Sequence, residues 1–322
     1  MLVAICHTDA TGWTEVSDLE QISDLIEAGR LVWAQADASS LSRTDVTTIQ
    51  EEFGLHPLAV EDAVEPRQRP KFEAYENHLF AVSHQLDIVD DHLEARQIAC
   101  FVGKYWVLTL HDGAERTLKE ATSRCMRIPK PVDRGPSFVM HSLLDTVVDD
   151  YQRIADDLED EVEDLEEKLL EEPTTEAGKQ IYGVKQRLAR SRRYVQPGSR
   201  VLATFVESNQ QTMATNETAA YFRDVLDHLL RITDQLRNVE DITDALIELR
   251  RNQQAHAQTD ITKRLTGWGA IIAVPTFIAS VYGMNFKLLP QQATLGGFYF
   301  AVAGMLASAV GLYVFFKKRD WI

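Results

Sequence analysis

The chain has 322 residues, with 33 lysines and arginines against 49 aspartates and glutamates, a net charge of −16 and 45% hydrophobic residues. That length allows two or three domains, and the composition is typical of a folded chain rather than a disordered or collagen-like one. The acidic balance excludes a general nucleic-acid binder, whose surface is basic, so we expect no nucleic-acid partner.

The first 136 residues mix strand-like and helix-like patterns, which predicts an α/β domain over residues 1–136. No basic segment precedes the apolar start of the chain, so we expect no signal peptide. Apolar runs bounded by turn residues predict strands at 31–37, 78–88 and 97–111, the last interrupted by a hairpin at Gly103-Lys104. Helices are expected at 17–28, with Ser17 as the N-cap, and at 44–53. The proline-rich stretch 127–136 marks the domain boundary.

Three scattered cysteines, Cys6, Cys100 and Cys125, form no CxxC pair. They provide neither a disulfide framework nor a zinc cluster. We expect buried structural thiols in a reducing compartment.

Long helices are predicted for residues 137–262, which we take as a second domain. Residues 137–172 lack glycine and proline, and thirteen of the residues from Asp149 to Glu172 are acidic. This surface is either a solvated helix face or a surface that attracts divalent cations, and we leave both interpretations open. A turn between Pro173 and Gly178 leads into a second helix, from Gln180 at least to Pro197.

The next helix is expected to be the longest. Residues 199–266 contain neither glycine nor proline, and the apolar residues from Leu229 to Leu249 form a near-heptad stripe. If the helix is unbroken from Tyr221 to Tyr282, it is on the order of 90 Å long at 1.5 Å per residue. Such a stalk can carry a conformational signal from a soluble body to a pore.

Two long apolar segments, 265–286 and 288–316, contain no charged residue. A spanning helix needs about 20 apolar residues, so we expect a two-span transmembrane hairpin at residues 263–322, in the lipid bilayer of the plasma or inner membrane. The link near 287–295 is too short to cross a bilayer, so both outer ends face one side. The basic tail of Lys317, Lys318 and Arg319 indicates that both termini are cytoplasmic.

The sequence Tyr282-Gly283-Met284-Asn285-Phe286 stands at the end of the first span. Together with the hairpin and the basic tail, it resembles the CorA family of divalent-cation channels. Further matches are Glu61-Asp62 with Gln68–Lys71, Tyr221–His228, Thr276–Tyr282 and Lys317–Trp321. The resemblance covers nearly the whole chain.

The resemblance implies a homopentameric funnel of cytoplasmic α/β domains, long helical stalks and two transmembrane helices per chain. It implies that Gly283, Met284 and Asn285 form the selectivity filter of a pore lined by the five first spans. The expected pore-lining positions are Leu265, Ala273, Thr276 and Ser280.

The same resemblance implies regulatory metal sites. Asp62 and Asp224 would form an intersubunit Mg²⁺-sensing site, with Glu61 and acids of the Glu159–Asp160 stretch at a second regulatory ion. Two apposed aspartates repel each other, so bound Mg²⁺ would hold a closed state and its loss would release the subunits. The alternative is that both are ordinary surface carboxylates.

The residue chemistry favours a hydrated ion. Mg²⁺ binds oxygen and gives up its water reluctantly, and a ring of Asn285 amides with Gly283 carbonyls can hydrogen-bond the waters of the ion. The first span has no Asp, Glu, His or Cys, which argues against a dehydrating site. We therefore expect Mg²⁺ as transported and regulatory ion, driven inward by the membrane potential. No phosphate-binding glycine loop or nucleophile–base pair is present, so we expect no organic cofactor and no enzyme activity.

This chain also departs from the family pattern. The family usually carries acids after its Gly-Met-Asn-Phe, whereas Lys287 to Gln292 contains none, so five lysines would slow cation entry at low salt. Thr262 and Ala273 stand where the family has bulky apolar residues, which leaves Leu265 as the main constriction.

Two alternatives remain open. One is a Zn²⁺, Co²⁺ or Ni²⁺ transporter of the same fold. The other, from a different class, is a membrane-anchored acidic helical scaffold or sensor. Asn285 argues against the second, because a simple anchor has no use for an amide at its mouth.

Overall fold

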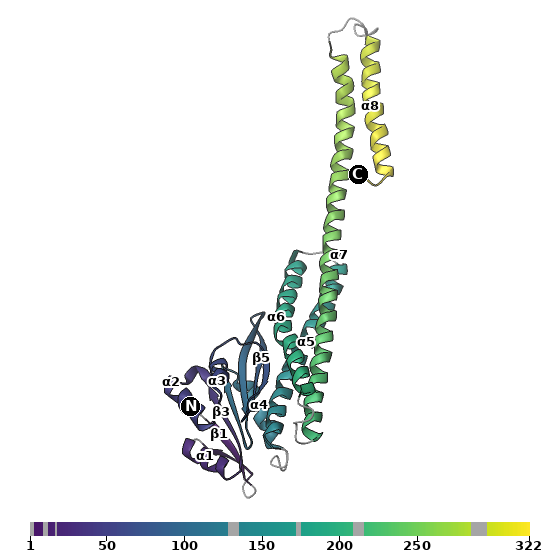
Figure 1. Ribbon diagram of the computed structural model, residues 1–322. Coiled ribbons are helices and arrows are strands. Elements are labelled where there is room, and N and C mark those ends of the chain that lie inside the picture. Colours follow the sequence, from purple (N-terminus) through teal and green to yellow (C-terminus); the bar gives the residue numbers. More distant parts are fainter. Residues whose placement is uncertain are drawn as a thin grey trace. The chain divides into compact units, whose positions relative to one another are not determined.

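The computed structural model describes residues 3–8, 12–16, 18–127, 135–171, 175–208, 216–284 and 295–322. The chain divides into two compact units, Met1–Leu246 and Ile247–Ile322. Helix α7 (Asn216–Tyr282) contributes residues to both. In the first unit, a sheet is covered by short helices on one face and by long helices on the other (Figure 1). In the second, the end of α7 lies beside α8 (Leu295–Lys318).

The sheet has seven strands in the order β2-β1-β3-β7-β6-β5-β4. They are β1 (Val3–Thr8), β2 (Gly12–Val16), β3 (Leu31–Asp37), β4 (Lys71–Ala74), β5 (Leu79–Val89), β6 (His92–Val102) and β7 (Trp106–His111). Strands β3 and β7 are parallel, and the other neighbours are antiparallel. The α/β prediction is thus confirmed, as is the hairpin at Gly103-Lys104, which joins β6 to β7. The sheet also includes β1, β2 and β4, which the sequence patterns did not predict.

Helices cover both faces of the sheet because the central strands are apolar on both. Helices α1 (Leu19–Glu27), α2 (Arg43–Glu52) and α3 (Pro57–Val64) share one core with alternate residues of the strands. Helix α4 (Glu115–Met126) packs on the other face, where Gln35 Nε2 donates to Thr122 Oγ1 at 2.9 Å. The cysteines Cys6, Cys100 and Cys125 are all free and buried, as expected.

Local caps set the helix boundaries, and one differs from the prediction. The N-cap of α1 is Asp18, whose carboxylate accepts from the Glu20 backbone at 3.3 Å. Ser17, the predicted cap, lies outside the described residues. Helix α2 begins after Ser42, which forms a reciprocal capping box with Asp45. A carboxylate satisfies exposed backbone N–H groups as well as a hydroxyl does, so sequence alone did not separate Ser17 from Asp18.

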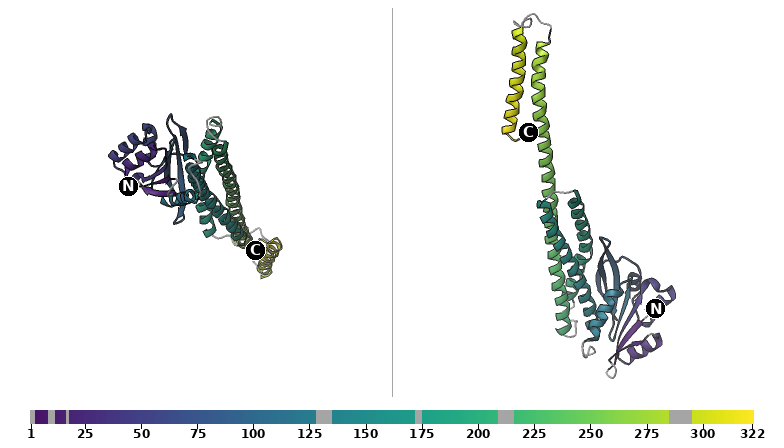
Figure 2. Two further views of the ribbon diagram at one scale, coloured as in Figure 1. Left: turned by 90° about the horizontal axis from the view of Figure 1, so that it is seen from below. Right: turned by 180° about the vertical axis from the view of Figure 1, so that it is seen from behind.

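Three long helices form the second layer: α5 (Pro136–Glu171), α6 (Thr175–Ser208) and α7, which lie side by side in both figures (Figures 1 and 2). Helix α6 starts earlier than predicted, and its end at Ser208 agrees with a helix expected to reach at least Pro197. The turn expected up to Gly178 is wrong at that residue, because Gly178 lies inside α6. The helix also continues through Pro197, flanked by the buried Val195 and Leu202. Packing therefore overrides the local cost of glycine and proline.

The predicted apolar stripe of the stalk is confirmed for the part in the first unit. Leu229, Ile232, Leu236, Val239 and Leu246 are all buried. Burying one such side chain contributes about 1.5–3 kcal/mol. Next to Leu236 of the stripe, Gln235 of α7 accepts a hydrogen bond at its Oε1 from Gln152 Nε2 of α5 at 2.8 Å. The stripe thus holds α7 to the rest of the bundle.

The second unit contains the two apolar helices. The segments Ala220–Tyr282 and Gly296–Lys318 contain windows long and apolar enough to span a membrane, with mean hydropathies of 1.5 and 1.9. Only 6% of each window is buried. An apolar surface this exposed favours a lipid environment over water. The tail after α8 returns to α7, where a Cβ at Gly267 would lie 3.1 Å from Ile322.

Candidate functional site

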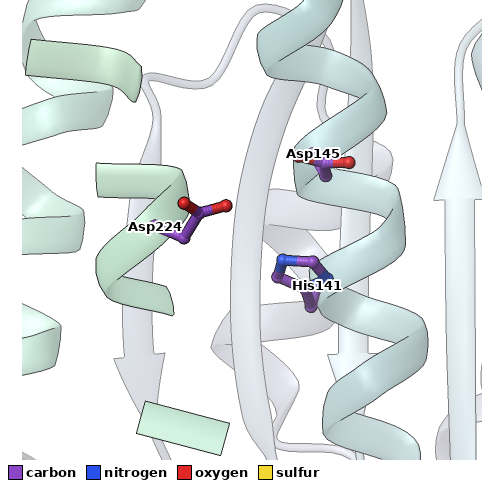
Figure 3. Close-up of side chains that lie close together, drawn as sticks. All are labelled: His141, Asp145 and Asp224. Atoms are coloured by element: carbon purple, nitrogen blue, oxygen red, sulfur yellow. The ribbon is translucent and has the colours of Figure 1, made fainter. Parts of the chain in front are cut away.

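Three side chains of metal-ligand type converge between α5 and α7. His141 and Asp145 lie one helical turn apart on α5, and Asp224 lies opposite on α7 (Figure 3). Their ligand atoms all lie within 4.8 Å of one another. We call these residues the His-Asp-Asp cluster. His141 and Asp145 are half-buried, and Asp224 is exposed.

The cluster is positioned by its apolar neighbours. Residues four apart share a helix face, so His141 and Asp145 point the same way while the intervening Leu143 and Leu144 are buried. On α7, Phe222 and Val225 on either side of Asp224 are buried in the bundle. The two helices therefore pack with the three polar side chains at the edge of their interface.

Aromatic contacts orient the imidazole of His141. Its ring centroid lies 4.8 Å from that of Tyr221 and 6.0 Å from that of Phe138. Tyr221 and Phe138 also meet each other edge to face at 5.9 Å. The histidine is therefore held in a defined place beside the two carboxylates.

Arg124 forms ion pairs with carboxylates on one side of the cluster, including that of Asp145. Arg124 Nη1 donates to Asp145 at 3.0 Å, and Arg124 Nη2 binds Glu120 at 2.8 Å and Asp149 at 2.6 Å. Burial alone would lower the pKa of Arg124, but the hydrogen bonds and charges of Glu120 and Asp149 outweigh it and raise that pKa. Asp145 is thus partly neutralised by Arg124, whereas Asp224 forms no ion pair with an arginine or lysine among the described residues; His228 Nε2 lies 4.0 Å from its Oδ1. A cation would gain more from Asp224.

The donor set of the cluster is two carboxylate oxygens and one imidazole nitrogen. Mg²⁺ prefers oxygen ligands and keeps several waters, whereas Co²⁺, Ni²⁺ and Zn²⁺ readily accept imidazole. The residues therefore fit a direct transition-metal site. They also fit a hydrated Mg²⁺ held by carboxylates, with the remaining positions taken by water.

The acids predicted on α3 have other neighbours within the chain. Asp62 accepts a hydrogen bond from Lys71 Nζ at 2.5 Å, and both side chains are about one-quarter exposed, at 23% and 26%. Burial alone would lower the pKa of Lys71, but its hydrogen bond to Asp62 and the charge of Glu73 outweigh it and raise that pKa. Glu61 is exposed. Whether Asp62 meets Asp224 of another subunit stays a prediction.

The acidic stretch of α5 is tied to α7 by one glutamine. Gln235 Nε2 donates to Asp156 at 2.9 Å and also to Glu159, while Asp160 is exposed. These contacts give Glu159 a structural partner. They leave open whether the stretch also holds an ion.

The predicted filter lies at the end of α7. Gly283 N donates to Ala279 O at 2.9 Å and Met284 N to Val281 O at 3.3 Å, which closes the last turn. Asn285 and Lys287 lie outside the described residues.

The predicted pore-lining residues share one exposed face of α7. They are Leu265, Ala273, Thr276 and Ser280, all exposed in the single chain. At about 100° per residue they fall within about 80° of the helix circumference. The arrangement therefore allows five chains to present them to one axis, although their role stays a prediction.

The basic tail begins in the last turn of α8, which contains Lys317 and Lys318, and continues with Arg319. Lys317 Nζ lies 5.7 Å from the ring centroid of Tyr313, and the Arg319 guanidinium lies 5.3 Å from that of Phe315. Lys318 is exposed. Cationic heads above aromatic rings are typical of residues at a membrane surface.

Sequence reasoning missed His141 and Asp145. A signal was present, because a His-x-x-x-Asp pair on one helix and an Asp-x-x-x-His pair, Asp224 and His228, on another each place two metal-ligand types on one face. Their convergence depends on the register between α5 and α7, which the sequence pattern does not provide.

Comparisons with known proteins agree with this architecture. A family model described as "CorA-like Mg2+ transporter protein" matches residues 29–318. The cobalt/magnesium transport protein CorA of Thermotoga maritima is 30% identical over 313 residues, covering 96% of this chain and 88% of the relative. The putative metal ion transporter YfjQ of Bacillus subtilis is 29% identical over 297 residues, covering 92% of each. The complete structure of the CorA magnesium transporter from Methanocaldococcus jannaschii has a TM-score of 0.82 at 20% identity, covering 100% of this chain and 99% of that one.

Proposed function

The chain belongs to the CorA-like Mg²⁺ transporter family, whose members are divalent-cation transporters of membranes, and we propose that it carries hydrated Mg²⁺ into the cytoplasm. The observation that carries this proposal is the exposed, uncharged face in the apolar last part of α7, residues 265–282, which precedes Gly283-Met284-Asn285 in the sequence. Five such faces in a homopentamer would surround a water-filled path. Both termini would then be cytoplasmic.

Conduction would depend on neutral oxygen ligands. Asn285 amides and Gly283 carbonyls at the mouth would hydrogen-bond the water shell of Mg²⁺, because removing that shell is costly. A site without formal charge also lets the ion leave. A doubly charged ion that crosses 100 mV gains about 4.6 kcal/mol, twice the value for one charge, so no nucleotide is needed.

Gating would use the cytoplasmic carboxylates. We propose that Asp62 of one subunit and Asp224 of its neighbour share Mg²⁺ when the ion is abundant, with Glu61 nearby. The ion would have to displace Lys71 from Asp62, because the two already form an ion pair at 2.5 Å. Loss of Mg²⁺ would free the subunits and open the path, which gives negative feedback.

A Co²⁺, Ni²⁺ or Zn²⁺ transporter is the second candidate. The imidazole of His141 beside Asp145 and Asp224 favours it, because these ions bind nitrogen more readily than Mg²⁺ does. The Thermotoga relative is named a cobalt/magnesium transport protein, which is consistent with more than one cargo. The membrane-anchored scaffold has no observation of its own in its favour.

Reconstituted full-length protein tests the proposal by ion flux into liposomes. Mg²⁺ uptake should exceed Co²⁺, Ni²⁺ and Zn²⁺ uptake in competition, and Asn285→Ala should reduce it at least about tenfold while pentamers persist. Gln292→Ala removes an amide outside the motif and serves as the control, with flux expected within about twofold. Undiminished, equally selective flux through Asn285→Ala would exclude the filter role. Preferential Zn²⁺, Co²⁺ or Ni²⁺ flux would favour the second candidate.

A further inference from the structure

A wide cleft in the first unit is lined by an unusual concentration of positive charge. It lies between the segment after α3, strand β6 and helix α6, and has a volume of about 1220 Å³. Six arginines line it: Arg67, Arg69, Arg190, Arg192, Arg193 and Arg200. The one acidic residue in the lining is Glu240 of α7. We call this feature the arginine cleft.

Most of this charge has no acidic partner in the part of the chain that the structure describes. Arg192 forms an ion pair with Glu240, and Arg190 Nη1 donates to the Leu93 carbonyl at 3.4 Å. Among the described residues, the other four arginines have no carboxylate partner, and each is exposed. Six arginines against one glutamate leave a formal charge of +5, in a chain whose net charge is −16. Such a cluster repels itself and favours a bound anion.

The cleft is built on rigid elements. On α6, Arg190, Arg193 and Arg200 recur at spacings of three and seven residues, so they lie on one face. Opposite them, Arg67 has a φ of 71°, a backbone conformation that non-glycine residues rarely adopt and that persists only where the surroundings hold it. The next residue, Gln68, donates from its backbone N to Gln97 Oε1 at 2.9 Å. Arg69 is therefore presented by a fixed segment.

The cleft also contains part of a motif singled out in the sequence that the proposed conduction path does not include. Of the sequence Gln68-Arg69-Pro70-Lys71, the first three residues line the cleft, while Lys71 turns to Asp62. One short segment thus contributes to the arginine cleft and to the proposed regulatory acid.

We propose that the arginine cleft binds a polyphosphate anion. The planar guanidinium matches phosphate oxygens in a two-pronged geometry, and acidic side chains that would repel phosphate are nearly absent from the lining. One phosphate carries a charge of about −2 and would leave most of the positive charge unmatched. A chain of phosphates, free or as part of a nucleoside triphosphate, meets several arginines at once. None of the six arginines belongs to the proposed filter, pore face or regulatory acids, so this proposal does not rest on the proposed function.

Calorimetric titration of the purified full-length protein tests the proposal. The buffer contains EDTA at fixed ionic strength, so that chelation of Mg²⁺ does not contribute, and the probes are tripolyphosphate, ATP and inorganic phosphate. Tripolyphosphate and ATP should bind with similar Kd, and phosphate at least about tenfold more weakly, because it meets fewer guanidinium groups.

Matched variants localise the binding. Arg69→Gln, Arg193→Gln and Arg200→Gln together should weaken tripolyphosphate binding at least about tenfold. The control replaces three exposed arginines of α7 outside the cleft by glutamine, namely Arg231, Arg237 and Arg251. It removes the same charge and should change the Kd for tripolyphosphate less than about twofold. Glu240→Gln removes the acid from the lining and should tighten binding about two- to threefold. This variant adds no bulk, so it tests the cleft even if the triple variant does not fold.

Several results would overturn the proposal. These are no binding of tripolyphosphate to the unaltered protein, equal losses in the two triple variants, or weaker binding in Glu240→Gln. Binding of ATP without tripolyphosphate would mean that the base is recognised instead. If the cleft variant lowers the fraction of pentamer and leaves the Kd unchanged, the arginines are subunit contacts.

Discussion

Removing Lys71 should make the proposed sensor respond at lower Mg²⁺ concentration. Lys71 holds Asp62 by an ion pair at 2.5 Å with both side chains about one-quarter exposed. A partly exposed pair of this kind contributes about 0.5–1 kcal/mol after solvent screening. Because Mg²⁺ must displace the ammonium to reach Asp62, Lys71→Met should lower the half-saturating Mg²⁺ concentration about two- to fivefold.

The assay is protection of the full-length protein against limited proteolysis over a Mg²⁺ titration. Lys119→Met serves as the control, because Lys119 is an exposed lysine of α4 that lines neither the cluster nor the cleft. Asp62→Lys should abolish protection at the concentrations that protect the unaltered protein. An unchanged or higher midpoint in Lys71→Met would refute the competition, and digestion that never depends on Mg²⁺ would refute the sensor itself.

Three further outcomes are expected. Burial lowers the pKa of His84 to about 4 from 6.5. As the pH falls, the imidazole is therefore protonated in the unfolded chain before it is protonated in the folded one. The free energy of unfolding is unaffected by this group above pH 6.5 and decreases by about 2 kcal/mol at pH 5 and about 3 kcal/mol at pH 4. His84→Phe should flatten that part of the pH dependence in urea unfolding followed by circular dichroism, and an equally steep profile would contradict the assignment. His141→Ala should weaken Co²⁺ binding at the His-Asp-Asp cluster about tenfold or more but Mg²⁺ binding less than about twofold, measured by equilibrium dialysis, because only the former ion favours imidazole; equal losses would mean that the histidine is not a ligand. Gln97→Ala should reduce Mg²⁺ protection and tripolyphosphate binding together, whereas loss of one alone would separate the two sites.

Much of the fold follows from local pattern. The strand Leu31–Asp37 has the predicted bounds, and the described residues of the glycine- and proline-free stretch 137–172, and residues 216–266 of the stretch 199–266, lie in α5 and α7. The short edge strands β1, β2 and β4 escaped prediction, because a short edge strand gains its stability from its neighbours rather than from its own apolar run. Gly178 inside α6 was misread for the same reason, since the bundle stabilises a helix that local propensity would end.

The candidate site was predictable only in part. Asp224 and the Gly-Met-Asn motif carry a family resemblance that one chain can show, and the family is confirmed. The approach of His141 to Asp224, the Lys71–Asp62 pair and the arginine cleft depend on which helix faces which strand. His141 and Asp224 are 83 positions apart, and Arg67 and Arg200 of the cleft are 133 apart, so they come together only through tertiary packing, about which periodicity contains no information.

The side-chain amide of Gln97 links the proposed Mg²⁺ sensor to the proposed polyphosphate site, which otherwise have no common residue. It is 5% exposed, and its Nε2 donates to the carbonyl oxygens of Asp62 at 3.0 Å and Glu65 at 3.1 Å, while its Oε1 accepts from Gln68 N. Rotation of this amide would release the end of α3 and the Arg69 segment in one event. If bound Mg²⁺ changes the affinity for the polyphosphate by way of this amide, the polyphosphate must change the affinity for Mg²⁺ by the same factor. Under this proposal, the Mg²⁺ concentration and the polyphosphate concentration in the cytoplasm would act on the protein through the same side chain, Gln97.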